Sequence, residues 1–382
     1  MATRRSARGW RANFIELPSS KHSMRLPSST GRPSAQQSPQ FRGNSPTQAG
    51  AERAVGGLAC GDGAPYNDRV RLPEASIHVS RDQNHLAWDP AIPAVASIGS
   101  GEVVELDCLD ASFGQLTAES TIETLARLDF DRVDQVTGPV AVEGAEPGDT
   151  LEIDLLEFEP ANWGWTASIP GFGLLADDFP DPVYKVTRLT AGADRVEFWP
   201  GIRIPVAPFC GVIGVAPTAG PLSTIPPDVH GGNMDTRHLV AGSTLFLPVF
   251  QPGANLSAGD GHATQGDGEV SGTALETPMR ARLRLTVRKD LHLDAPAFLA
   301  APDPHAALRN GTRYATDGIG PDLMIAARDA VRRMIDWLGR EHGLTPEQAY
   351  LLCSVAIDLR ISEIVDVPNF IVTAYCPLGI FE

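Results

Sequence analysis

Lysine is scarce in this sequence of 382 residues, since only Lys185 and Lys289 occur after residue 21. A hydrolytic site built from a cysteine, a glutamate and a lysine needs a lysine beside the nucleophile, so the scarcity argues against such a site. The motif Gly-x-Ser-x-Gly is also absent. That motif exposes a nucleophilic serine on a sharp turn, and its absence argues against a serine triad of this type.

Cysteine is sparse as well, and it shows no pairing pattern. The five cysteines are Cys60, Cys108, Cys210, Cys353 and Cys376. No two of them form a Cys-x-x-Cys pair, and this usage fits a reducing cytoplasm, which is the location we predict. Cys210 is open to a nucleophilic role, but its apolar neighbours Phe209 and Val212 favour a buried structural thiol.

The sequence lacks any run of about 18 apolar residues, which predicts no membrane-spanning helix.

Charge is distributed unevenly along the chain. The first 65 residues hold nine of the 31 Lys and Arg residues and three of the 47 Asp and Glu residues. The remainder therefore has 22 basic and 44 acidic residues, a net charge of −22. Such an acidic body is unsuited to the phosphate backbone, and we predict no nucleic-acid partner.

Glycine and proline are plentiful, at 37 and 32 residues, and 42% of the chain is apolar. This composition predicts a β-rich protein with many turns and a sizeable core. Residues 1–70 are rich in Ser, Pro, Gln, Gly and Arg and poor in aliphatic residues. Burial of so few apolar side chains cannot offset the entropy lost on ordering, so we predict a disordered extension there.

Short alternating patterns predict most of the strands. Residues 94–98 and 102–109 flank a Gly-Ser-Gly turn and are interpreted as a hairpin, and residues 140–158 as a strand pair around the turn at 146–149. Residues 280–287 alternate Arg with apolar residues, which predicts a strand with one solvated face. Helical periodicity appears only near the C-terminus, at 321–340 and, after a Thr345-Pro-Glu-Gln348 capping box, at 345–359.

The stretch Gly259–Glu276 concentrates polar side chains among five glycines. Its oxygen and imidazole donors are Asp260, His262, Gln265, Asp267, Glu269 and Glu276. In an extended chain residues two apart project to one side, so Asp260 can meet His262. By the same spacing Asp267 can meet Glu269. Gly-Asp clusters are also ordinary turn material, but here Asp-Gly-His and Asp-Gly-Glu recur within ten residues, which favours a divalent metal site over a hairpin turn.

A second polar loop is His230-Gly-Gly-Asn-Met-Asp235. In this loop Asn233 can donate a side-chain amide, and Asp235 can bind a metal or orient a histidine. The glycines allow close approach of the backbone.

Several ordered blocks resemble the acetamidase/formamidase family of amide hydrolases. They are the Asp260-Gly-His-Ala, Gln265-Gly-Asp-Gly-Glu269 and Ala274-Leu-Glu276 strings together with the segments Gly138–Asp149, Pro170–Leu175, Pro208–Pro217 and His230–Asp235. The resemblance runs from about His78 to the C-terminus. It implies a jelly-roll-like β-sandwich, a small β-barrel-like unit and a C-terminal α+β part, and it places His85 and Asp110 near the site.

We therefore expect a mainly β protein with a disordered extension (1–70), a β-sandwich and β-barrel catalytic body (71–290) and a C-terminal α+β segment (291–382). The expected reaction is hydrolysis of a short aliphatic amide, of the acetamide or formamide type, to carboxylate and ammonia. The expected partner is a small-molecule amide, and we expect a homo-oligomer.

The predicted cofactor is a divalent metal, zinc by preference, with calcium at a second site. The predicted metal ligands are His262, Asp260, Asp267, Asp235, Asp110 and His85, and the predicted catalytic residues are Glu269, Glu276 and Asn233. Two alternatives are a non-catalytic β-sandwich that binds calcium through the same loop and a cysteine-dependent carbon–nitrogen hydrolase. Calcium sites use oxygen ligands, so His262 favours a zinc-like ion.

Overall fold

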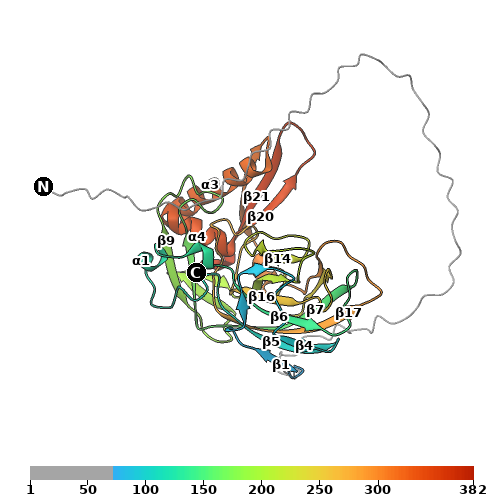
Figure 1. Cartoon of the computed structure of the whole chain (residues 1–382). Coiled ribbons are helices and arrows are strands. Elements are labelled where there is room, and N and C mark those ends of the chain that lie inside the picture. The colour runs from blue at the N-terminus through green and yellow to red at the C-terminus, as the bar shows by residue number, and fades with distance from the viewer. Residues whose placement is uncertain (1–71) are drawn as a thin grey trace, which may run out of the picture. The chain divides into compact units, whose positions relative to one another are not determined.

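The computed structural model describes residues 72–382, which lie within one compact unit, Asp68–Glu382. The predicted disordered extension of residues 1–70 lies outside the described residues. The described part is mostly β with a few helices towards the C-terminus, as predicted (Figure 1). The predicted boundary at residue 290 stays a prediction.

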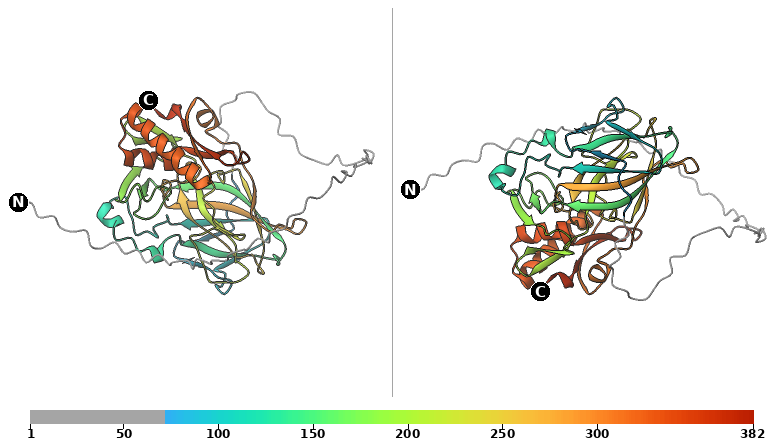
Figure 2. Two further views of the ribbon diagram at one scale, coloured as in Figure 1. Left: turned by 90° about the horizontal axis from the view of Figure 1, so that it is seen from above. Right: turned by 90° about the horizontal axis from the view of Figure 1, so that it is seen from below.

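One six-stranded sheet, the first sheet, has the order β1-β5-β17-β7-β15-β18. Its strands are β1 (Ile77–Val79), β5 (Glu102–Cys108), β17 (Met279–Arg288), β7 (Thr150–Pro160), β15 (Thr244–Pro248) and β18 (Ala297–Leu299). The orange β17 lies between β5 and β7, as Figure 2 shows. Ala281, Leu283 and Leu285 of β17 are buried, whereas Arg282 pairs with Glu105 on the outer face, so the predicted solvated face is confirmed.

The second six-stranded sheet contains the order β14-β12-β16-β6-β2, with β4 paired to β6. Its strands are β14 (Gly231–Asn233), β12 (Phe209–Gly214), β16 (Leu256–His262), β6 (Val136–Val142), β2 (Asn84–His85) and β4 (Ala96–Ile98). Leu106, Ile153 and Leu283 of the first sheet share one buried apolar cluster with Phe209 and Leu256 of the second. The two sheets therefore face a common core, while the jelly-roll topology and the barrel-like unit stay predictions.

The two predicted hairpins are wrong in their pairing. β4 pairs in parallel with β6 in the second sheet, whereas β5 pairs with β17 and β1 in the first. In the same way β6 and β7 lie in different sheets. A turn flanked by alternating strands predicts a reversal but not the partner of each strand. Both turns carry the chain from one sheet to the other, so that both flanking strands bury their apolar side chains in the same core.

The C-terminal part combines two helices with a three-stranded sheet, β19-β21-β20. Its elements are β19 (Arg313–Gly320), α3 (Leu323–His342), α4 (Pro346–Ala356), β20 (Asp358–Glu363) and β21 (Phe370–Pro377). Gly343 ends α3 in the left-handed conformation, and the capping box of Thr345 and Gln348 opens α4. Both helix signals were therefore predicted correctly, although α4 ends three residues before the expected Leu359.

Shorter elements complete the described chain. They are β3 (Ala87–Trp88), β8 (Trp163–Ser168), β9 (Val183–Arg188), β10 (Arg195–Trp199), β11 (Ile202–Pro205), β13 (Leu222–Ser223), α1 (Ile122–Leu125), α2 (Ala306–Arg309) and the 3₁₀ turns Phe130–Arg132 and Leu378–Ile380. Among residues 72–382, no helix is both long and apolar enough to cross a bilayer.

Candidate metal centre

The central polar cluster is built at the end of β16, where Asp260 and His262 are both buried. β16 pairs with β12, with Phe209 opposite His262 and Val212 opposite Gly259. Gly211 of β12 forms the wall behind the cluster, because a Cβ atom there would lie only 2.5 Å from Asp260 Oδ2. No side chain fits that space without displacing the carboxylates.

His262 Nε2 is the atom on which four carboxylates converge. It lies 3.0 Å from Asp260 Oδ2 and 3.2 Å from Glu276 Oε2. Asp235 Oδ1 and Glu269 Oε1 each lie 4.0 Å from it. Two sets of candidate metal ligands result, Asp235 with His262 and Glu269, and Asp260 with His262 and Glu276.

The other ring nitrogen is held by Gln265. His262 Nδ1 lies 3.0 Å from Gln265 Oε1, and Gln265 Nε2 donates to the carbonyl oxygen of Asp235 at 2.7 Å. An amide oxygen can only accept, so this pattern assigns a proton to Nδ1. A neutral ring then turns its Nε2 lone pair towards carboxylate oxygens, which are also acceptors. A second proton or a cation must lie between them.

Three oxygens of the cluster are buried without a hydrogen-bond partner, Asp235 Oδ1, Asp260 Oδ1 and Glu276 Oε2. A buried carboxylate oxygen left unpaired costs on the order of several kcal/mol. A divalent cation would satisfy these oxygens together with the His262 lone pair. The side chains present therefore fit a metal of the type that combines oxygen and imidazole ligands.

Protonation in the cluster follows from burial and mutual repulsion. Burial raises the pKa of Asp235 and of Glu276 well above the usual range, and it raises the pKa of Glu269 to about 8. For His262 burial opposes the charged ring, yet Asp260 and Glu276 raise its pKa well above the usual value. Burial also opposes ionisation of Asp260, but His262 outweighs it and lowers the Asp260 pKa. Without a cation, the cluster thus retains protons on Asp235, Glu269 and Glu276, whereas Asp260 is ionised.

Asp134 is a buried acid near this cluster that sequence analysis missed. Its pKa is raised well above the usual range, first by burial and then by the negative charges of Asp260 and Asp235. Its backbone adopts φ of 52°, a left-handed conformation that is unusual for a residue other than glycine. Asp134 lies outside the glycine-rich stretches, so no sequence motif marks it as a site residue.

Asp110 is not among the ligands of the two sets. Its Oδ1 accepts hydrogen bonds from the Ser112 hydroxyl and, at 3.1 Å, from Trp165 Nε1. Burial raises the Asp110 pKa. The expectation that Asp110 lies near the site and its role as a ligand both stay predictions.

Three predicted site residues make contacts elsewhere. Asp267 accepts from Arg237 Nε at 2.8 Å. The His85 ring lies 2.8 Å from Ser257 Oγ and 2.7 Å from the carbonyl oxygen of Ala87. Asn233 Nδ2 donates to the carbonyl oxygen of Ile225 at 3.0 Å, while its Oδ1 is buried without a partner.

The geometric argument that put Asp267 and Glu269 on one side is wrong. Residues 263–275 form no strand, and Gly268 and Glu269 have φ of 101° and 42°. These two left-handed residues turn Glu269 towards His262 while Asp267 points to Arg237. Glu276 also lies outside a regular strand, in isolated bridges to Trp165 and His262, and the amide of Ala274 donates to its Oε1 at 2.7 Å.

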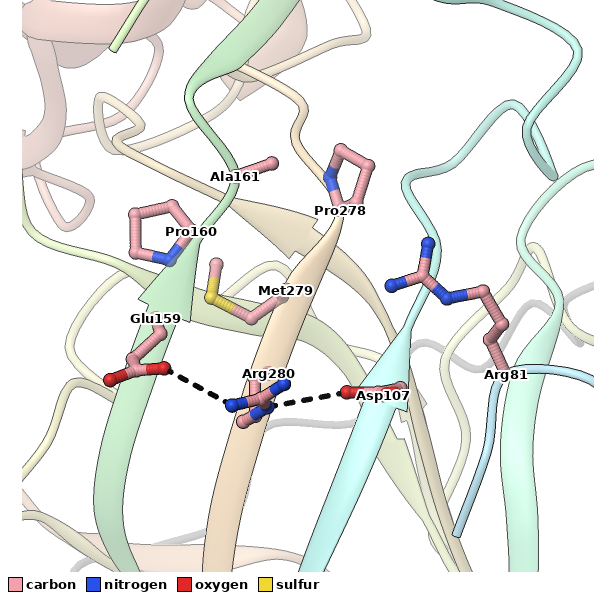
Figure 3. Close-up of a pocket in the computed structure, with 8 residues that line it drawn as sticks. All are labelled: Arg81, Asp107, Glu159, Pro160, Ala161, Pro278, Met279 and Arg280. Carbon is pink, nitrogen blue, oxygen red and sulfur yellow. Dashed lines mark hydrogen bonds and ion pairs between the residues drawn. The ribbon is translucent and has the colours of Figure 1, made fainter. Parts of the chain in front are cut away.

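A surface pocket of about 200 Å³ lies elsewhere, against the end of β17 (Figure 3). Arg280 crosses it and pairs with Asp107 at 3.4 Å and with Glu159 at 3.7 Å. None of the cluster residues lines this pocket, and its acidic side chains are paired with Arg280. Unpaired buried polar atoms, the usual mark of a reactive site, are found in the His262 cluster, so we place the candidate site there.

A mostly β protein with buried carboxylates around one imidazole has the side chains of a hydrolytic enzyme. Residues 73–223 and 219–382 match the Acetamidase/Formamidase family, and the chain belongs to that family. The predicted class, an amidase acting on carbon–nitrogen bonds, is thereby confirmed.

Individual relatives extend this finding. The chain is 27% identical to a formamidase of Methylophilus methylotrophus over 78% of this chain and 90% of that one. It is similar to the solved acetamidase of Bacillus halodurans at 32% identity and a TM-score of 0.56, over 79% and 97% of the two chains. It is also similar to a γ-lactamase of Delftia acidovorans, at 26% identity and a TM-score of 0.71, over 79% and 90%.

Proposed function

We propose that this protein hydrolyses short aliphatic amides of the acetamide or formamide type to carboxylate and ammonia, with a bound divalent ion, zinc, at the His262 cluster. The observation that carries the proposal is the convergence of four carboxylates on His262 Nε2 in a chain of this family. The names of the relatives support the substrate class.

The proposed ligands are His262 Nε2, Asp260, Glu276 and Asp235. When bound, a zinc ion supplies a Lewis acid and lowers the pKa of water to about 7. Gln265 keeps the Nε2 lone pair of His262 free by accepting from Nδ1–H. Both ligand sets found among the described residues share His262, so they form one site. A second site that binds calcium stays a prediction.

Glu269 is the proposed general base. The side chain of Glu269 is 16% exposed, whereas that of Glu276 is 2% exposed and has one oxygen bound by the Ala274 amide. A base must take a proton in the site and return it to the leaving nitrogen, so one side of its carboxylate has to stay open. Glu269 meets that requirement, and Glu276 is better suited to holding the ion.

Asn233 is proposed as a substrate contact. Its free, buried Oδ1 is an acceptor suited to an amide N–H, two residues from Asp235 in the chain. His85, Asp110 and Asp267 are proposed to act indirectly, since each side chain is bound to other groups.

The test uses chelated protein to which Zn²⁺ is added in steps, and it measures ammonia release from formamide, acetamide and propionamide and ring opening of a γ-lactam to the amino acid. We expect activity that saturates near one equivalent of Zn²⁺ and is lost in His262→Ala, a change that removes the only imidazole of the cluster. Binding of Ca²⁺ without any hydrolysis would instead support the non-catalytic calcium module. Activity that survives full chelation but is lost in Cys210→Ser would support the cysteine mechanism. Light scattering tests the proposed homo-oligomer.

A further inference from the structure

A partly buried ionic cluster lies beside the candidate metal centre and shares no ligand atom with it. We call it the Arg–Asp network, and its members are Arg237, Arg309, Arg360, Asp267, Asp303 and Asp358. Three positive and three negative side chains balance within it. Its members come from the segment after β14, the central glycine-rich stretch, the loop before α2, α2 itself and β20.

Arg237 is the centre of this network. Its Nε lies 2.8 Å from Asp267 Oδ1, its Nη2 lies 3.2 Å from Asp358 Oδ2, and its Nη1 lies 3.9 Å from Asp303 Oδ2. Its side chain is only 6% exposed. A planar guanidinium has donors in fixed directions, so one arginine can fix three chain segments relative to one another.

Two of these segments carry carboxylates of the His262 cluster. Arg237 follows Asp235 by two residues, and Asp267 precedes Glu269 by two residues. The ion pair between Arg237 and Asp267 therefore joins the two loops whose carboxylates lie 4.0 Å from His262 Nε2. Asp235 and Glu269 are also the more exposed carboxylates of the cluster, with side chains 23% and 16% exposed, so they depend most on such support.

The network also fastens the central stretch to the C-terminal part. The amide of Leu359 donates to the carbonyl oxygen of Asp267 at 3.0 Å, and the amide of Asp267 donates to Asp358 Oδ1 at 3.2 Å. Asp358 also accepts from Arg237. The position of Glu269 is thereby linked to β20, at the start of which Asp358 lies.

Loss of one partner in such a partly buried network is costly, because it leaves a charge without compensation. Arg309 already has two nitrogens without a hydrogen-bond partner, Nε and Nη1. An intact ionic network of this kind adds little net stability compared with apolar side chains of the same volume, which favours a positioning role.

We infer that Arg237 is a positioning residue for the reaction. Through Asp267 it holds Asp235 and Glu269 at the distance from His262 that ion binding and proton transfer require. The inference rests on the proposed function. It also gives Asp267 a role different from that of a metal ligand, namely the anchor of the Glu269 loop.

The experiment compares Arg237→Lys, Asp267→Asn and the double variant in the full chain. Zn²⁺ affinity is measured by competition with a chelator, and kcat and KM are measured with acetamide. We expect each single variant to weaken Zn²⁺ binding and to lower kcat by about 10- to 100-fold, the scale for partners that orient metal ligands, with KM nearly unchanged. The double variant should lose no more than the worse single variant, because both changes break one contact.

Arg282→Lys is the matched control, because Arg282 makes an ion pair of the same length with Glu105, 2.8 Å, on the outer face of the first sheet. It should leave both measurements unchanged.

If Arg237→Lys does not fold, the Asp267→Asn variant alone tests the inference. The Asp267 side chain is 25% exposed, so the substitution should disturb folding less. Wild-type Zn²⁺ affinity and kcat in Asp267→Asn would overturn the inference, and so would additive losses in the double variant, because these would mean that Arg237 and Asp267 act independently. An inactive wild type that binds Zn²⁺ normally would contradict the proposed function instead, and the Zn²⁺ affinities would still test Arg237.

Discussion

At the scale of residues, spacing alone predicted part of the cluster. Asp260 and His262, two residues apart near the end of β16, do converge, although Asp260 has a left-handed φ of 53° and not the extended conformation assumed. Glu269 reaches His262 for a different reason than expected, since the left-handed residues Gly268 and Glu269 turn it there. Asp134 could not be predicted, because it lies more than 120 residues earlier and only pairing within the second sheet brings it near.

Glu269→Gln is predicted to keep Zn²⁺ and to lose turnover. Glutamine preserves size and hydrogen bonding but cannot accept a proton, so only the chemical step should suffer. We expect kcat to fall by about 10² to 10⁴ while the Kd for Zn²⁺ changes little. Glu276→Gln serves as the contrast and should weaken Zn²⁺ binding, since Glu276 Oε2 lies 3.2 Å from His262 Nε2. Loss of Zn²⁺ from Glu269→Gln would identify Glu269 as a ligand.

At the scale of elements, helices were easier to predict than strand partners. The signals for α3 and α4, a cap, a stop and one apolar stripe, all lie within the helix or next to it. The partners of β4 and β5 lie more than 25 positions away, which no local pattern contains. The wall formed by Gly211 belongs to this scale too, because it results from the register of β12 against β16.

Gly211→Ala is predicted to damage the site without disturbing the sheet. The new methyl group would lie 2.5 Å from Asp235 Oδ1 and from Asp260 Oδ2, so both carboxylates must move. A displacement of about 1 Å can cost about 10²-fold in rate, and we expect at least a tenfold loss of kcat/KM and of Zn²⁺ affinity. The control is Gly339→Ala in α3, where the nearest atom would be 3.4 Å away. Equal behaviour of both variants would show that Gly211 is not a wall of the site.

At the scale of the whole molecule, the C-terminal part packs against the central glycine-rich stretch, Gly259–Glu276. The amide of Gly266 donates to the carbonyl oxygen of Ser354 in α4, and a Cβ atom at Gly266 would lie 2.2 Å from the carbonyl oxygen of Ile357. The composition predicted a β-rich chain, and the periodicity and a capping box predicted helices near its end. It could not predict that these helices pack on the glycine-rich stretch, because that contact depends on the complete fold.

Deletion of residues 1–65 is predicted to leave activity and stability nearly unchanged. The segment has few aliphatic residues to contribute to a core, and the match to the family begins at residue 73. The measurements are kcat/KM with acetamide and the thermal midpoint of the shortened protein against the full chain. A soluble shortened protein without activity would contradict the prediction.

Zinc is predicted to stabilise the whole protein through the His262 cluster. In the absence of a cation, four carboxylates share one imidazole, and three of their oxygens are buried without partners. Unfolding exposes these oxygens to water but also destroys the site. An ion that binds only the folded protein therefore stabilises the folded protein. At 100 times the Kd the gain is about 2.7 kcal/mol, which should raise the thermal midpoint by about 5 °C. His262→Ala should abolish the shift, and Ca²⁺ at the same concentration should produce a smaller one because calcium does not favour imidazole. A shift of equal size in His262→Ala would mean that zinc binds elsewhere on the chain.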